Sequence, residues 1–85
     1  MIVNELVKTF GFTRDKLSHF NIHLYKPVTE RWITLKHPTV DEYIYIADRQ
    51  VIDWTVENGT SIIDITVYME DEDLDIFAER FKEDW

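Results

Sequence analysis

The feature that most restricts the fold is the pair Asn58-Gly59, which lies between two stretches rich in β-branched and aromatic residues, 50–57 and 60–68. Asn-Gly is the preferred sequence of a two-residue type I′ turn, because both central residues of that turn need a positive φ. The sequence therefore predicts an antiparallel hairpin here. It would have one apolar side and one mostly polar side, as is typical of a sheet with one face toward solvent.

Such a turn also fixes which residues of the hairpin face each other. On the apolar side Trp54 would face Ile63, and on the polar side Asp53 would face Asp64, with Cβ atoms about 5 Å apart. Like charges in these positions destabilise a sheet. A partner's Lys or Arg or a bound cation would compensate the two carboxylates. Screening by solvent, or a different register, would also remove the conflict.

Hydrophobic periodicity predicts the other elements. Apolar residues alternate from Ser18 onward, over 31–37 and over 42–47, which favours strands. Helical spacing occurs near both ends, at Val3, Leu6, Val7 and Phe10 and at Leu74, Phe77, Ala78, Phe81 and Trp85. We therefore expect one α+β domain, residues 1–85. It would be an antiparallel β-meander of about five strands, flanked by an N-terminal and a C-terminal helix packed on one face.

Charge is distributed unevenly along the chain. The chain has 17 acidic and 9 basic residues, a net charge of −8, with +3 on residues 1–40 and −11 on residues 41–85. A chain this acidic repels phosphate groups, and we therefore expect no direct binding to nucleic acid or to an anionic membrane. A basic partner would instead be attracted.

Several kinds of chemistry lack the residues they need. The chain has no cysteine, which excludes disulfides and thiolate catalysis and favours a reducing compartment. Its N-terminal residues do not resemble a signal peptide, so we expect a cytoplasmic protein. Neither serine lies in a nucleophile elbow, and the two glycines stand too far apart for a phosphate loop. His19 and His23 fall in a predicted strand, where their spacing does not suit a metal. We expect no enzyme, no cofactor and no metal.

A partner-binding surface is the remaining candidate site. The expected members are acids and tyrosines of the second half, namely Tyr43, Tyr45, Asp53, Glu57, Asp64, Asp71 and Glu72. The tyrosines would lie on the wet face as interface hot spots or as simple cross-strand cover. The acidic run 70–73 would stabilise the start of the last helix, contact a basic partner, or do both.

These observations favour a small non-enzymatic protein–protein interaction module. We expect an inhibitor that occupies the basic, nucleic-acid-binding surface of a partner protein. Its length and charge are similar to those of phage-encoded inhibitors directed against host defence, an analogy of composition that no motif supports. Two alternatives stay open: a homo-oligomeric structural subunit, and a small-ligand binder with a pocket between subunits.

Overall fold

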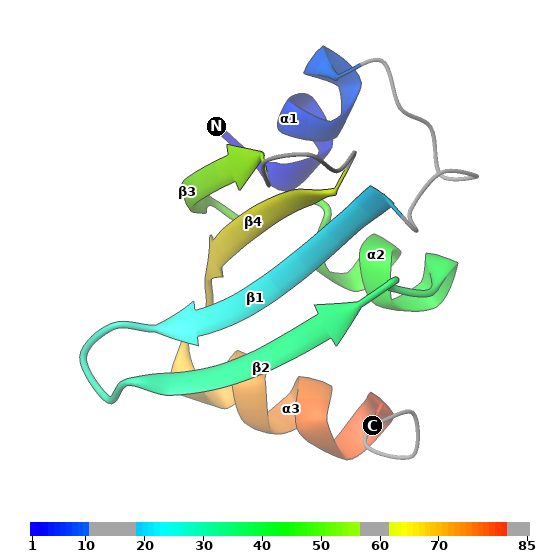
Figure 1. Cartoon of the computed structure of the whole chain (residues 1–85). Coiled ribbons are helices and arrows are strands. Elements are labelled where there is room, and N and C mark those ends of the chain that lie inside the picture. The colour runs from blue at the N-terminus through cyan, green and yellow to red at the C-terminus, as the bar shows by residue number, and fades with distance from the viewer. Residues whose placement is uncertain (11–18, 57–61, 82–85) are drawn as a thin grey trace.

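The protein is an α+β domain, as expected, and Figure 1 shows its arrangement in a computed structural model. The structure describes residues 1–10, 19–56 and 62–81. These residues form α1 (Val3–Thr9), β1 (Phe20–Lys26), β2 (Arg31–Lys36), α2 (Val40–Ile46), β3 (Val51–Val56), β4 (Ile63–Tyr68) and α3 (Asp71–Phe81). The turn at Asn58-Gly59 and the expected core residue Trp85 lie outside the described residues.

The sheet is mixed, so the expected antiparallel meander of about five strands is wrong. Four strands lie in the order β2-β1-β4-β3. Two antiparallel pairs, β1 with β2 and β3 with β4, are joined at the centre by parallel pairing of β1 with β4. β2 and β3 therefore form opposite edges, and the connection through α2 must carry the chain from one edge to the other.

Residues 42–47, expected to be a strand, belong to helix α2 and the loop that follows it. The local cause is a capping box. The Glu42 amide donates to Thr39 Oγ1 at 3.2 Å, and the Thr39 amide donates to Glu42 Oε1 at 2.8 Å. These bonds satisfy amides that a helix start leaves without partners. The β-forming residues of the segment were misleading, because Tyr43 and Ile46 also have the i, i+3 spacing of a helix and are both buried.

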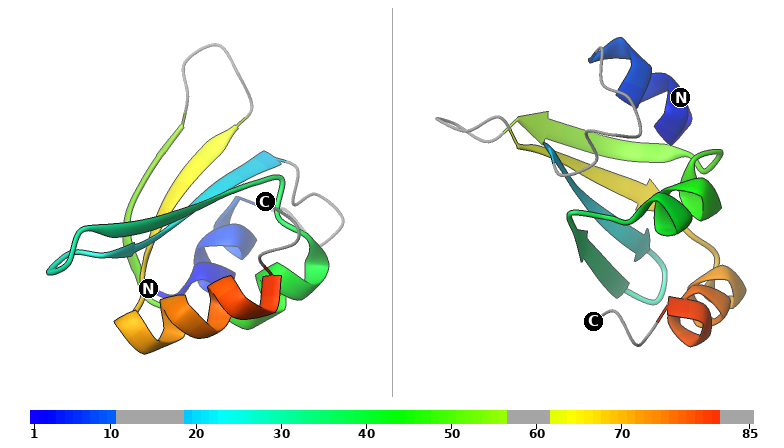
Figure 2. Two further views of the ribbon diagram at one scale, coloured as in Figure 1. Left: turned by 90° about the horizontal axis from the view of Figure 1, so that it is seen from below. Right: turned by 90° about the vertical axis from the view of Figure 1, so that its right-hand side faces the viewer.

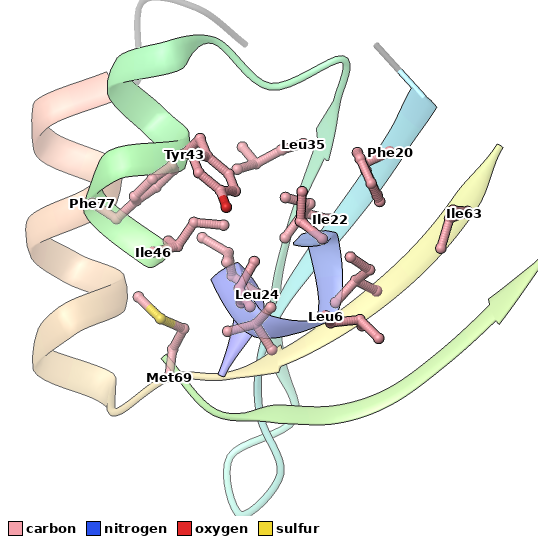
Figure 3. Packing of buried hydrophobic residues seen from close by; sticks show 14 of the residues in the cluster. Leu6, Phe20, Ile22, Leu24, Leu35, Tyr43, Ile46, Ile63, Met69 and Phe77 are labelled. Atoms are coloured by element: carbon pink, nitrogen blue, oxygen red, sulfur yellow. The ribbon is translucent and has the colours of Figure 1, made fainter. Parts of the chain in front are cut away.

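The three helices lie on the same side of the sheet, as Figure 2 shows. Between them and the sheet lies one core, whose members are Val3, Leu6, Val7, Phe20, Ile22, Leu24, Leu35, Tyr43, Ile46, Ile63, Ile65, Val67, Met69, Leu74, Phe77 and Phe81. Figure 3 shows α2 and α3 directing Tyr43 and Phe77 toward the strands that carry Ile22 and Leu35. The expected packing of both terminal helices on one face of the sheet is confirmed.

The register of β3 against β4 differs from the expected one by two residues. Trp54 pairs with Ile65 and not with Ile63, and an irregularity interrupts the ladder between Val51 and Asp53. The expected register rested on a two-residue turn at Asn58-Gly59, which lies outside the described residues. Trp54 keeps the expected side of the sheet, because its partner Ile65 is buried.

Two aromatic residues on this side of the sheet should differ in their contribution to stability. Phe77 is fully buried, so Phe77→Ala should lower the free energy of unfolding by about 3–5 kcal/mol through the cavity that it leaves. Trp54 is 44% exposed and touches Phe10 edge-on, so Trp54→Ala should cost less than about 2 kcal/mol. Urea denaturation of both variants checks this, and equal losses would contradict it.

Candidate functional site

The candidate site is the side of the sheet that the helices leave uncovered, which we call the open face. Its members alternate with buried residues along β1, β2 and β4, or pair with such members from β3. Its members are Asn21, His23 and Tyr25 of β1, Trp32, Thr34 and Lys36 of β2, Asp53 and Thr55 of β3, and Asp64, Thr66 and Tyr68 of β4. In register they form three rows that cross the sheet. The first row is Trp32, Tyr25 and Tyr68, the second is Thr34, His23, Thr66 and Asp53, and the third is Lys36, Asn21, Asp64 and Thr55.

The first row is aromatic. Tyr25 of β1 pairs with Trp32 of β2 on one side and with Tyr68 of β4 on the other. The rings of Tyr25 and Trp32 are stacked, with centroids 3.9 Å apart and planes 16° from parallel. Trp32 is 54% exposed in spite of this contact. The open face therefore presents a large apolar ring that its neighbour holds in place.

The second row centres on His23, which lies between a hydroxyl group and a carboxylate. Its Nδ1 is 3.2 Å from Thr34 Oγ1, and its Nε2 is 3.2 Å from Asp64 Oδ1. The imidazole also meets the Trp32 ring edge-on, with centroids 6.3 Å apart. These contacts couple the aromatic row to the carboxylate of the third row.

Asp53 and Asp64 share the open face but do not face each other, so the expected like-charge pair is wrong. In the observed register Asp53 pairs with Thr66, and Asp64 pairs with Thr55. Asp64 lies beside His23, while Asp53 Oδ1 accepts a hydrogen bond from the Trp54 amide at 2.8 Å. The shift of two residues in register relieves the repulsion that the expected turn would impose.

A three-residue cluster closes the end of the sheet beside the aromatic row. Lys26 Nζ donates to the Tyr68 hydroxyl at 2.8 Å and to Glu70 Oε2 at 2.9 Å, and the Tyr68 hydroxyl donates to Glu70 Oε1 at 2.6 Å. The hydrogen bonds from Tyr68 and Lys26 lower the pKa of Glu70. Those to Tyr68 and Glu70 raise the pKa of Lys26. Tyr68 is thereby fixed at the end of the row.

The acidic residues at the start of α3 are bound largely within the chain. Arg31 of β2 reaches Asp71 and Asp75, with its shorter contact at 2.7 Å, and Arg49 donates to Asp73 at 2.9 Å. Asp71 also accepts from the Thr29 hydroxyl. Asp71 is therefore less available to a partner than expected.

The other expected site residues lie away from the open face. Tyr43 is buried and donates to Asn4 Oδ1, so its expected exposure is wrong. Tyr45 is half-buried against Phe77 and Phe81 on the helical side. Both changes follow from the helix that replaces the expected strand.

Glu72 is exposed on α3, whereas Glu57 lies outside the described residues.

The aromatic row was not anticipated as a site, although part of its pattern is visible in the sequence. Alternation over 31–37 already placed Trp32 on the side opposite Ile33 and Leu35, and that over 20–25 placed Tyr25 opposite Leu24. What the sequence could not supply was the parallel contact that brings Tyr68 alongside, because no local pattern encodes it.

Comparison with known proteins identifies no relative. No model of a known protein family matches the chain, and neither a curated protein nor a solved structure gives a significant match. Among residues 1–10, 19–56 and 62–81, no helix has the length and apolarity needed to cross a membrane. In the same part of the chain, no three His, Asp or Glu side chains gather closely enough to hold a metal ion.

The cluster of Lys26, Tyr68 and Glu70 predicts a pH dependence of stability. A lowered pKa in the folded state means that ionised Glu70 stabilises the fold above its ordinary pKa, near 4.5. That contribution is lost as the pH falls through the lowered value. Glu70→Gln should therefore be less stable than the wild type at neutral pH, with a difference that shrinks in acid.

Urea unfolding over a series of pH values measures this difference. Glu72→Gln, which removes a charge from an exposed position on the same helix, serves as the control and should show a smaller difference. A difference between Glu70→Gln and the wild type that stays constant into acid would contradict the role given to the ionised carboxylate.

Proposed function

We propose that this chain is a small non-enzymatic module that binds a basic protein through its open face. The observation that carries the proposal is the aromatic row on a sheet face that no described helix covers. Trp and Tyr dominate the binding energy of many interfaces, because they bury a large area at a small cost in side-chain entropy.

The stacking of Tyr25 on Trp32 supports this role. A large exposed side chain that rotates freely loses entropy when it is bound, and this loss weakens binding. Here the neighbouring ring and His23 already restrict the tryptophan before any partner arrives. The polar second and third rows, with Thr34, Thr66 and Asp64, would form the rim around this anchor.

The charge of the chain supports a basic partner. The net charge of −8 creates a field that attracts a cationic surface and raises the rate of encounter. Because Arg31 and Arg49 hold much of the acidic start of α3, this charge would act mainly at long range. Asp53 and Asp64 on the open face are the proposed direct contacts, whereas Glu72 on α3 adds to the long-range charge.

The partner class that we propose is proteins that handle nucleic acids, since large basic surfaces are characteristic of them. By occupying such a surface the chain would inhibit its partner without contacting nucleic acid itself. This mode of action needs only binding, and it agrees with an open face built of stacked rings and hydrogen-bonded side chains.

The test is affinity capture from the native host at low salt, followed by titration with the partner identified. Trp32→Ala should weaken binding at least about 30-fold, the loss expected of a hot spot of about 2 kcal/mol. Ile44→Ala on α2, where the side chain is similarly exposed, is the matched control and should bind as the wild type does.

Salt dependence gives an independent readout of the same complex. Affinity should fall as the salt concentration rises, because screening removes the long-range attraction between opposite charges. Trp32→Ala that binds as tightly as the wild type would overturn the proposed site, and an affinity indifferent to salt would overturn the basic partner.

A further inference from the structure

The β3 edge of the sheet exposes a row of apolar side chains. Ile52, Trp54 and Val56 are 46%, 44% and 51% exposed. Edge strands present unpaired backbone groups, and proteins usually protect them with charged residues, with proline or with a covering segment. Asp53 is the single charged residue of β3, and this strand contains no proline.

The opposite edge of the sheet is protected in the usual way. β2 begins with Arg31 and ends with Lys36. The guanidinium of Arg31 binds Asp71 and Asp75, which ties this edge to α3. On β2 the exposed apolar side chain is Trp32, between charged strand ends, whereas β3 exposes three apolar side chains and carries one charge.

The N-terminal residues occupy only the first part of the β3 edge. The Val51 amide donates to the Met1 carbonyl at 2.9 Å, and Ile2 forms a bridge with Gln50. The part of β3 beyond this contact runs from residue 52 to residue 56. Its central residue is Trp54.

Within the described part of the chain no strand pairs with residues 52–56 at this edge, and the segment is complementary to a second copy of itself. When two copies of one strand pair antiparallel, the two-fold axis between them is normal to the sheet, and opposed residues point to the same face. The axis must therefore pass beside one residue, which faces its own counterpart in the second copy. An axis at Trp54 places Ile52 opposite Val56 and Asp53 opposite Thr55. An axis at Asp53 would instead place two carboxylates opposite each other, which is destabilising.

We propose that two copies of this chain pair through β3, antiparallel and about a two-fold axis at Trp54, to form one continuous eight-stranded sheet. In the single chain the Trp54 amide donates to the carboxylate of its neighbour Asp53. Such a local bond competes with strand pairing. In the dimer this amide donates to the backbone of the second copy instead. The bond to Asp53 therefore competes with dimer formation and weakens it.

This inference is independent of the proposed function. A second copy added at the β3 edge leaves the open face uncovered, with the aromatic row centred on β1, away from the axis. The salt dependences are also opposite. Each copy carries a charge of −8, so screening should strengthen self-association, whereas it weakens binding to a basic partner.

The test is sedimentation velocity of the purified chain from low to high micromolar concentration, at low and at high salt. The wild type should pass from monomer to dimer as the concentration rises, and more readily at high salt. Val56→Lys should raise the dimer dissociation constant at least about tenfold, because it places a charge opposite Ile52 at both ends of the pairing. Asp53→Ala should lower it.

Ile76→Lys is the matched control, since Ile76 on α3 is as exposed as Val56. It should dimerise as the wild type does, and circular dichroism should confirm that both lysine variants are folded. If Val56→Lys does not fold, hydrogen exchange of the wild type is measured instead. The Trp54 amide should then exchange more slowly as the protein concentration rises. A wild type that stays monomeric throughout, or an Ile76→Lys variant that alone loses the dimer, would overturn the proposal.

Discussion

The parallel pairing of β1 with β4 is the contact on which the rest of the structure depends. It joins two antiparallel pairs that are each local in sequence, and it places their other strands at opposite edges. Once β2 and β3 lie at opposite edges, the chain between them must cross the sheet, and α2 makes that crossing on the same side as α1 and α3. All three helices bury their apolar residues against that side of the sheet. The other side carries aromatic and polar side chains.

Charge that is separated along the sequence is brought together in the fold. The basic residues of the first half include Lys26 and Arg31, and the fold carries both to the acidic start of α3. Arg49 binds the same region from the loop before β3. A sum over half of the chain therefore overstated the acidity of any one surface. The net charge of the whole chain is unchanged by these ion pairs and acts at long range. The feature that sets the open face apart from the rest of the surface is its stacked rings.

The elements that could be predicted from the sequence are those whose pattern is local. The helical spacing of Leu74, Phe77 and Phe81 and the alternation of β1 and β2 were sufficient, and their buried sides were predicted correctly. α2 was missed because alternating tyrosine and isoleucine favours a strand, while the decisive bonds between Thr39 and Glu42 required attention to capping. The parallel centre of the sheet, and with it the alignment of Tyr68 with Tyr25, depends on contacts between distant residues that no local pattern specifies.

The central strand pair also has a consequence for the order of folding. Phe20 pairs with Ile63 across a segment that contains β2, α2 and β3, so closing this contact carries the entropy cost of a long loop. Contacts of such high sequence separation slow folding. During synthesis β1 can pair with β2 early, yet its second side waits until β4 has been made. The nascent chain therefore holds a half-satisfied strand until β4 has been made, and the sheet should close only after that point.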